Sequence, residues 1–171
     1  MKCDRIVKSE GMILVNDDVG KILLIKNVVF TSEGYNQADM KSLRGRPCLV
    51  ISQTDEHYYM LPMSSHMSRF QEDLNFGFKQ DNIFGYDKHN CNADSFVRVS
   101  DLFKREIRFY EELGFVSKFQ FLKMLKYIIQ NYDFLKNNSL NGNLYDEIIK
   151  NLRKQRNDII CEEKKLVKKR G

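Results

Sequence analysis

The chain has 171 residues, of which 28 are Lys or Arg and 23 are Asp or Glu, giving a formal net charge of +5. This length suits one domain with a real hydrophobic core, and a hydrophobic content of 42% is ordinary for a globular protein. No apolar run approaches the roughly 18 residues of a membrane span, and no secretory hydrophobic region begins the chain, so we expect a cytoplasmic protein without a membrane partner.

Residues up to about 115 show the pattern of a β-rich region, in which short apolar runs alternate with polar turns. The predicted strands are 12–15, 20–25, 48–53, 58–63, 75–78, 95–99 and 107–111. A short polar turn, Thr54-Asp55-Glu56, predicts that the third and fourth of these form a hairpin. A long loop is expected at 31–43, and most of 67–95 is expected to be irregular.

The pattern changes to helix from about residue 116. Ser117 is a suitable N-cap for a helix that reaches about Lys136. Its apolar residues recur at helical spacing; they are Phe121, Leu125, Ile128, Tyr132 and Leu135. A polar break ending at Gly142 precedes a second helix from about Asn143. Strands followed by helices indicate one α+β domain over 1–171, with a small β-barrel at 1–115 and a mainly helical part at 116–171 packed alongside.

The C-terminal end is basic. Residues 150–171 carry nine Lys or Arg and three Asp or Glu, so the rest of the chain is close to neutral. A localised basic helix suggests a polyanionic partner, most often a nucleic acid. A solvated helix end, whose cations complement the helix dipole, fits the same charges.

The four cysteines, Cys3, Cys48, Cys91 and Cys161, lack the paired spacing of zinc sites or redox dithiols. Cys48 lies inside an apolar run, where a small hydrophobic residue suits the core. His89 and Cys91 can supply two metal ligands, but no second pair accompanies them. We therefore expect structural thiols, no metal site and no cofactor.

Two prolines, Pro47 and Pro62, mark the edges of the strands predicted at 48–53 and 58–63. If these strands pair antiparallel, the start of the first lies beside the end of the second. Polar groups suited to phosphate would then meet at one edge of the sheet. These groups belong to Arg44, Arg46, Ser64, Ser65 and His66.

Five segments, in order along the chain, resemble motifs of the MazF/Kid/PemK superfamily of endoribonuclease toxins. They are Gly20-Lys21-Ile22-Leu23-Leu24-Ile25, Arg46-Pro47-Cys48-Leu49-Val50-Ile51-Ser52, Leu61-Pro62-Met63-Ser64-Ser65, Ser95-Phe96-Val97-Arg98-Val99 and Leu113-Gly114. The second is similar to the family's R-P-x-L-V-hydrophobic-S strand, and the third to its P-hydrophobic-T/S-S signature. The longer helical end and residues 121–131 are similar to the ToxN/AbiQ/CptN branch, and to CptN most closely.

This resemblance implies a compact SH3-like antiparallel β-barrel of the MazF/Kid type with helices packed alongside. It also implies the toxin of a type III toxin–antitoxin system, which cleaves RNA sequence-specifically without a metal and leaves 2′,3′-cyclic phosphate and 5′-hydroxyl ends. The implied partners are the RNA substrate and a small, structured antitoxin RNA with a pseudoknot-like repeat. The toxin processes this RNA, is inhibited by it and assembles with it into a hetero-oligomer. A role in phage defence would follow from the same resemblance.

The resemblance assigns catalytic roles to Arg46, Ser64 and Ser65. Arg46 matches the family's arginine before the proline, and its planar fork suits the charge that develops on phosphate. The two serines match the family's hydroxyl pair, which can donate to phosphate or orient the 2′-hydroxyl, although each would also suit a turn cap.

His66 departs from the branch, which commonly has a proline here with a lysine after it; Met67 replaces that lysine. The imidazole of His66 can act as a general acid or base. The branch places basic and aromatic active-site groups in the loop before the arginine strand, and Lys41 is the corresponding catalytic candidate. The candidates for RNA binding are Tyr35, Arg44, Arg69, Lys150, Arg153, Lys154 and Arg156.

Two other functions remain open at this point. One is a MazF-like mRNA interferase that a protein antitoxin neutralises. The other is an RNA-binding barrel without catalytic activity.

Overall fold

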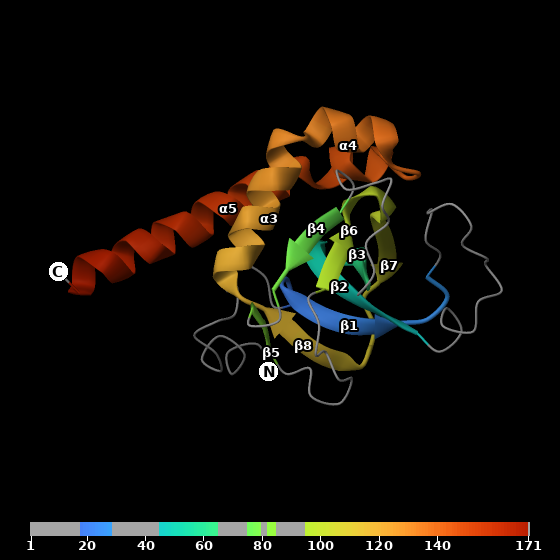
Figure 1. The fold of residues 1–171 in the computed structure, drawn as a ribbon, viewed down its shortest axis with the longest axis horizontal. Helices are drawn as coiled ribbons and strands as arrows, with labels where there is room; N and C mark the ends of the chain where they lie inside the picture. Colours follow the sequence, from blue (N-terminus) through green and yellow to red (C-terminus); the bar gives the residue numbers. More distant parts are fainter. Residues whose placement is uncertain (1–17, 29–44, 65–74, 80–81, 85–94, 171) are drawn as a thin grey trace.

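The computed structural model describes residues 18–28, 45–64, 75–79, 82–84 and 95–170. In these ranges the strands precede residue 117 and three α-helices follow, so the protein is α+β as the sequence predicts (Figure 1). No helix in the described ranges is both long and apolar enough to cross a membrane.

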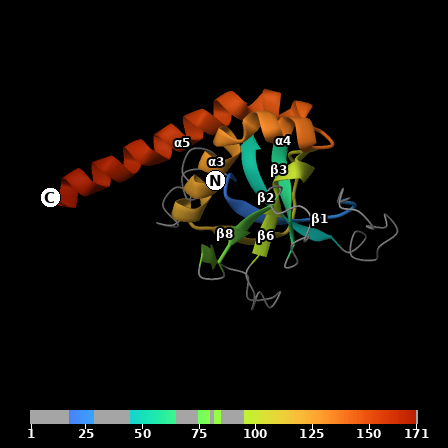
Figure 2. The same cartoon turned by 45° about the horizontal axis from the view of Figure 1, so that its top comes forward.

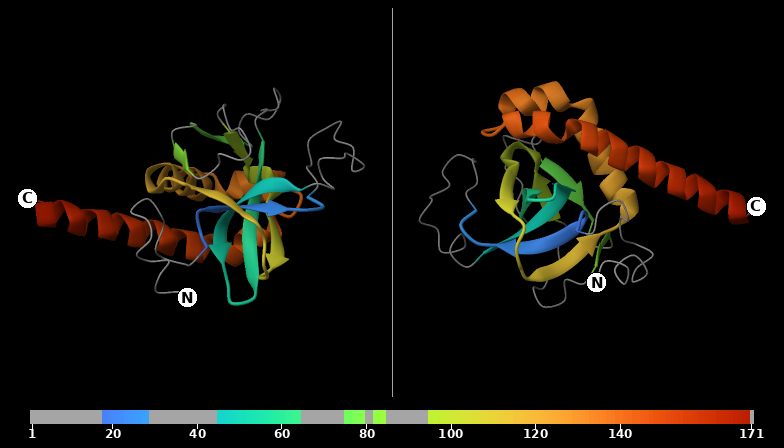
Figure 3. Two further views of the ribbon diagram at one scale, coloured as in Figure 1. Left: turned by 90° about the horizontal axis from the view of Figure 1, so that it is seen from below. Right: turned by 180° about the vertical axis from the view of Figure 1, so that it is seen from behind.

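Within the described ranges, eight strands form one antiparallel sheet. They are β1 (Lys21–Ile25), β2 (Arg46–Gln53), β3 (His57–Ser64), β4 (Asn75–Phe78), β5 (Ile83–Phe84), β6 (Ser95–Arg98), β7 (Phe103–Glu106) and β8 (Glu112–Val116). The strand order is β4-β6-β3-β2-β1-β8-β5, and β7 also pairs with β3. The first residues of β3 pair with β7 and its last two pair with β6, so this strand joins two parts of the sheet. Figure 3 shows how strongly the sheet curves.

The β2–β3 hairpin forms as predicted. The Oγ1 atom of Thr54 accepts hydrogen bonds from the backbone N–H groups of Glu56 and His57, at 3.3 and 3.0 Å, which closes the turn. Cys48 pairs with Pro62, and the register shifts once between Val50 and Ser52. This short, side-chain-closed turn fixes which residues of the two strands face each other.

One prediction about the strands is wrong and another is incomplete. Residues 107–111 are not a strand; they connect β7 and β8, and the side chain of Phe109 is 91% exposed. Phe109 therefore faces solvent instead of a neighbouring strand, whereas Tyr110 is partly buried beside the ring of Tyr58. The region 67–95, expected to be irregular around one strand, also contains β5, which pairs with β8. The strand expected at 12–15 and the loop expected at 31–43 lie outside the described residues.

The helices are α3 (Lys118–Gln130), α4 (Tyr132–Asn138) and α5 (Asn143–Arg170). Ser117 is the N-cap of α3, as predicted, and its Oγ atom accepts from the N–H of Gln120 at 3.2 Å. The single helix expected to reach Lys136 is divided at Asn131. The side chain of Asn131 donates to the carbonyl of Tyr127 at 2.8 Å, beside the bond that its own backbone N–H makes to the same carbonyl at 3.0 Å.

The first half of α5 packs against the sheet. The buried side chain of Gln155 donates to the carbonyl of Ile51 in β2 at 2.9 Å, and Tyr145 donates to the carbonyl of Val99. Burial raises the pKa of the Tyr145 phenol, which keeps it protonated as a donor. The second half of α5 projects away from the body of the protein (Figures 1 and 2). Its apolar residues Leu166 and Val167 are 48% and 70% exposed.

Candidate functional site

The edge formed by the start of β2 and the end of β3 holds two of the predicted catalytic residues. Arg46 is the first residue of β2 and Ser64 the last of β3. The last pair of β2 and β3 toward this edge is Cys48 with Pro62, two residues from Arg46 and two from Ser64. Arg46 itself pairs with Ile25 of β1, and Ser64 pairs with Phe96 of β6. The antiparallel pairing expected from the two prolines therefore places both residues at the same end of the hairpin.

Arg46 is held in a largely dry environment. The residue is 8% exposed, and burial lowers the pKa of its guanidinium, an effect that the neighbouring Cys48 partly opposes. The buried Cys48 thiol has its own pKa raised by burial. A guanidinium stays protonated in proteins, so burial makes the charged form costly, and a phosphate brought against Arg46 would offset part of that cost.

Gly45 positions the start of β2. Its φ of +102° is one that side-chain-bearing residues rarely adopt, and a Cβ atom there would lie 2.9 Å from Cγ of Leu24 in β1. Arg46 follows directly and pairs with Ile25 of β1. The glycine therefore lets the chain enter β2 close against β1, which sets where the Arg46 backbone lies.

Replacing Gly45 with Ala should destabilise the protein by about 1–2 kcal/mol, because the backbone is left-handed there and β1 leaves little room. Urea denaturation measures this change. Gly77→Ala in β4 is the matched control, since Gly77 has no positive φ and meets only the ring of Phe96. Equal stability of the two variants would show that the backbone before Arg46 is not constrained.

Six predicted site residues lie outside the described part of the chain. They are Tyr35, Lys41, Arg44, Ser65, His66 and Arg69. Of the predicted catalytic residues, the structure therefore describes only Arg46 and Ser64, and the catalytic role of each stays a prediction.

The four basic residues predicted on the C-terminal helix lie on the packed half of α5. Lys150, Arg153 and Lys154 are exposed and Arg156 is half-buried, whereas Leu152 and Gln155 on the same helix are buried. Spacings of three and four residues place Lys150, Arg153 and Lys154 on one face. This face is directed to solvent and is available to a polyanion.

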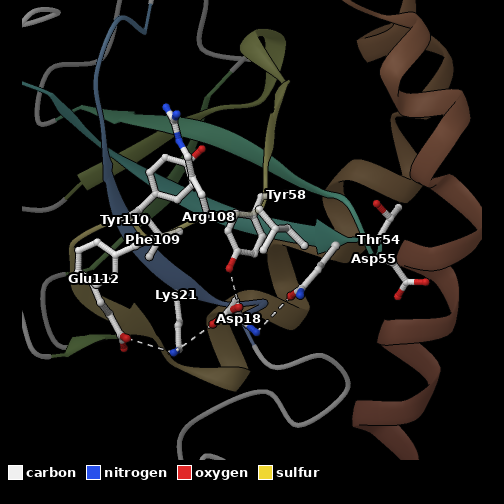
Figure 4. Close-up of a pocket in the computed structure, with 12 residues that line it drawn as sticks. Asp18, Lys21, Thr54, Asp55, Tyr58, Arg108, Phe109, Tyr110 and Glu112 are labelled. Carbon is white, nitrogen blue, oxygen red and sulfur yellow. Dashed lines mark hydrogen bonds and ion pairs between the residues drawn. The ribbon is translucent and has the colours of Figure 1, made fainter. Parts of the chain in front are cut away.

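A cavity of about 440 Å³, which sequence reasoning missed, lies at the other end of β2 (Figure 4). Residues from β1 and the chain before it, from the β2–β3 turn and the strand residues beside it, and from the β7–β8 connection and the start of β8 line it. These are Asp18, Lys21, Leu23, Gln53, Thr54, Asp55, Tyr58, Ile107, Arg108, Phe109, Tyr110 and Glu112. The consecutive Arg108, Phe109 and Tyr110 were the available signal, and the wrong strand prediction at 107–111 concealed it.

Charged groups form a chain of contacts in this cavity. Figure 4 shows Glu112, Lys21 and Asp18 in a row, with the hydroxyl of Tyr58 directed at Asp18. The Nζ atom of Lys21 lies 3.0 Å from Oε2 of Glu112 and 3.2 Å from Oδ1 of Asp18, and Tyr58 donates to Oδ2 of Asp18 at 2.7 Å. The side chains of Lys21 and Asp18 are 7% and 13% exposed, but that of Glu112 is 48% exposed. The carboxylate of Glu112 is thus the solvent-accessible end of this row of contacts.

Among the described residues, no group of three or more His, Cys, Asp or Glu side chains could hold a metal ion. Searches found no family model and no curated protein that matches the chain.

Proposed function

We propose that this protein is an endoribonuclease of the toxin type that cleaves RNA without a metal, with Arg46 and Ser64 at the cleavage site. The observation that carries the proposal is the antiparallel pairing of β2 and β3, with a buried arginine and a hydroxyl at the same end of the hairpin. The two residues come from sequence motifs that resemble those of the MazF/Kid/PemK toxins.

The proposed reaction uses the nucleophile that RNA carries itself. The 2′-oxygen loses its proton to a general base and forms a bond to phosphorus, while the bond from phosphorus to the 5′-oxygen breaks and that oxygen takes up a proton. Negative charge builds on the non-bridging oxygens in between. The Arg46 fork can donate two hydrogen bonds to these oxygens, and the Ser64 hydroxyl can donate a third. Lys41 and His66 are the predicted groups for the two proton transfers.

The proposed fold is the SH3-like barrel of the MazF/Kid toxins. The antiparallel pairing, the strong curvature of the sheet and the sharing of β3 between β2, β6 and β7 support it. In such a barrel the ends of β2 and β3 would form one rim, open to an RNA strand.

The proposed partner is a structured antitoxin RNA in a cytoplasmic ribonucleoprotein complex. The exposed Lys150, Arg153 and Lys154 on α5 support this partner, because phosphate contacts from Lys and Arg dominate RNA affinity. The basic half-helix beyond them, which projects from the body, enlarges the same surface.

The test is to incubate the purified protein with RNA in excess EDTA and analyse the products. Fragments that end in a 2′,3′-cyclic phosphate and begin with a 5′-hydroxyl are expected, because the chemistry needs no metal. Intact RNA that nevertheless co-migrates with the protein would instead identify a binding protein. Sequencing of RNA that co-purifies with the protein tests the partner: a discrete species of repeat length is expected, and a co-purified acidic protein would contradict it.

A further inference from the structure

The cavity at the far end of β2 is separate from the proposed cleavage edge. Arg46 begins β2 and Gln53 ends it, and Gln53 lines the cavity. At about 3.3 Å per residue, these two residues stand roughly 20 Å apart along the strand. We propose that this cavity holds one unpaired RNA base, with a preference for guanine, and so forms a second contact with the RNA. The inference rests on the proposed function in taking RNA as the ligand.

Size and shape suit a single base. A volume of about 440 Å³ lies within the range of cavities that hold small ligands, roughly 300–1,000 Å³. Its walls combine apolar Leu23 and Ile107 with the rings of Tyr58 and Tyr110, whose centroids are 6.1 Å apart. Unpaired bases are recognised by stacking on aromatic rings together with hydrogen bonds to the base edge.

Phe109 supplies the stacking surface. Its side chain is 91% exposed, the highest value among the exposed large apolar residues of the described chain. A base that stacks on it would remove this ring from water, a gain of roughly 1–3 kcal/mol per base in single-strand binding. The neighbouring Arg108 lies with its guanidinium carbon 5.4 Å from the centre of the Tyr110 ring, where it can reach the phosphate of the same nucleotide.

The row of contacts among Asp18, Lys21 and Glu112 explains the preference for guanine. Asp18 and Glu112 share one ammonium, that of Lys21, and the exposed carboxylate of Glu112 has further acceptor positions. Guanine presents two adjacent N–H donors, on N1 and on the exocyclic amine, which one carboxylate can accept together. The O6 acceptor of guanine lies beside these donors, where the third N–H of Lys21 can reach it. Adenine and cytosine each offer only the amine, and uracil offers a single ring N–H.

The position of the cavity favours a nucleic acid. The lining charges alone do not separate a base from a cationic side chain, because the carboxylates of Asp18, Asp55 and Glu112 accompany the cations of Lys21 and Arg108. The helix α5 contacts Ser52 through Asn151, next to the lining residue Gln53. The exposed basic residues of α5 therefore lie on an element that packs against this end of β2, so one RNA strand can contact both.

Saturation-transfer NMR with GMP, AMP, CMP and UMP tests the proposal on the full-length protein. These probes contain no internal phosphodiester bond, so their binding is independent of cleavage. The wild type should bind GMP most tightly. Phe109→Ala should weaken GMP binding at least about fivefold, the lower end of the stacking contribution. Glu112→Gln should abolish the preference for GMP over AMP. Since both side chains are exposed or half-exposed, neither variant should unfold the protein.

Two matched variants serve as controls. Phe119→Ala removes another exposed phenylalanine, 59% exposed on α3 beneath Lys123, and Glu111→Gln changes a carboxylate next to the cavity but outside its lining. Both should bind GMP as the wild type does. Absence of nucleotide binding, binding that neither test variant weakens, or tighter binding of arginine methyl ester than of GMP would overturn the proposal. Cleavage measured on the same preparations separates the two proposals. Cleavage without GMP binding would refute only the proposal that the cavity binds a base. GMP binding without cleavage would refute only the proposed reaction.

Discussion

Replacing Arg46 with Ala should lower the rate of RNA cleavage by about 10²–10³-fold, the usual cost of removing a group that stabilises charge in the transition state. The effect should be large because the Arg46 side chain lies in a mostly dry environment, where its interaction with a phosphorane is poorly screened. Initial rates in EDTA, measured with RNA in excess, give the change. Circular dichroism melting shows whether the variant is folded.

Two further arginine variants make this experiment specific. Arg46→Lys keeps the positive charge but loses the planar fork, so it should recover only a small part of the activity. Arg105→Ala on β7 removes a second arginine whose charge acts on the Cys48 thiol; it contacts the carbonyl of Asn27 and the ring of Phe103, and its loss should lower cleavage less than that of Arg46. Cleavage by Arg46→Ala at the wild-type rate would eliminate Arg46 from the mechanism. A milder loss is expected from Ser64→Ala, since a neutral hydroxyl donates a weaker bond than a guanidinium.

The part of the site that could be predicted from sequence depends on local rules. The hairpin turn at Thr54 is short, and its side-chain hydrogen bonds close it within three residues. Once such a turn is placed, counting outward from Gln53 and Tyr58 brings the start of β2 and the end of β3 to one end of the hairpin. The exact register there is not predicted by this count, because it shifts by one residue between Val50 and Ser52. Ser117 was predictable for the same reason, because an N-cap bonds to the residue three positions ahead.

The cavity could not be predicted this way, because distant parts of the chain build it. Lys21 and Glu112, which contact each other, are 91 positions apart in the sequence. Tyr58 and Asp18, which form the next hydrogen bond in the cavity, are 40 positions apart. Phe109 misled the prediction, since an apolar residue beside Ile107 and Tyr110 has the pattern of a strand. Only the fold shows that no strand lies beside it and that its ring faces solvent.

Arg98 shows that a buried arginine in a family-like segment can have a structural role. Its Nε atom lies 2.9 Å from Oδ2 of Asp101, and the two side chains are 4% and 1% exposed. Asp101 belongs to the short 3-10 helix Val99–Asp101 that follows β6, so the ion pair holds this helix against the strand. Arg46 is likewise buried and at one end of its strand, where it pairs with Ile25 of β1. Burial alone therefore does not distinguish a catalytic arginine from a structural one.

Asp101→Ala should destabilise the protein by about 3–5 kcal/mol, because it leaves the buried Arg98 guanidinium without its carboxylate. The double variant Arg98→Met, Asp101→Leu should recover much of this loss, since apolar side chains of similar volume replace both charges. Urea denaturation measures the free energy of unfolding of each variant. Lys104→Ala is the control, because its pair with Glu147 is about 40% exposed on both sides and should contribute less than about 1 kcal/mol. If Asp101→Ala cost no more than Lys104→Ala, the buried pair would not support the fold. RNA cleavage by the double variant, measured per folded molecule, should equal that of the wild type, which separates the structural arginine from the one proposed to act on phosphate.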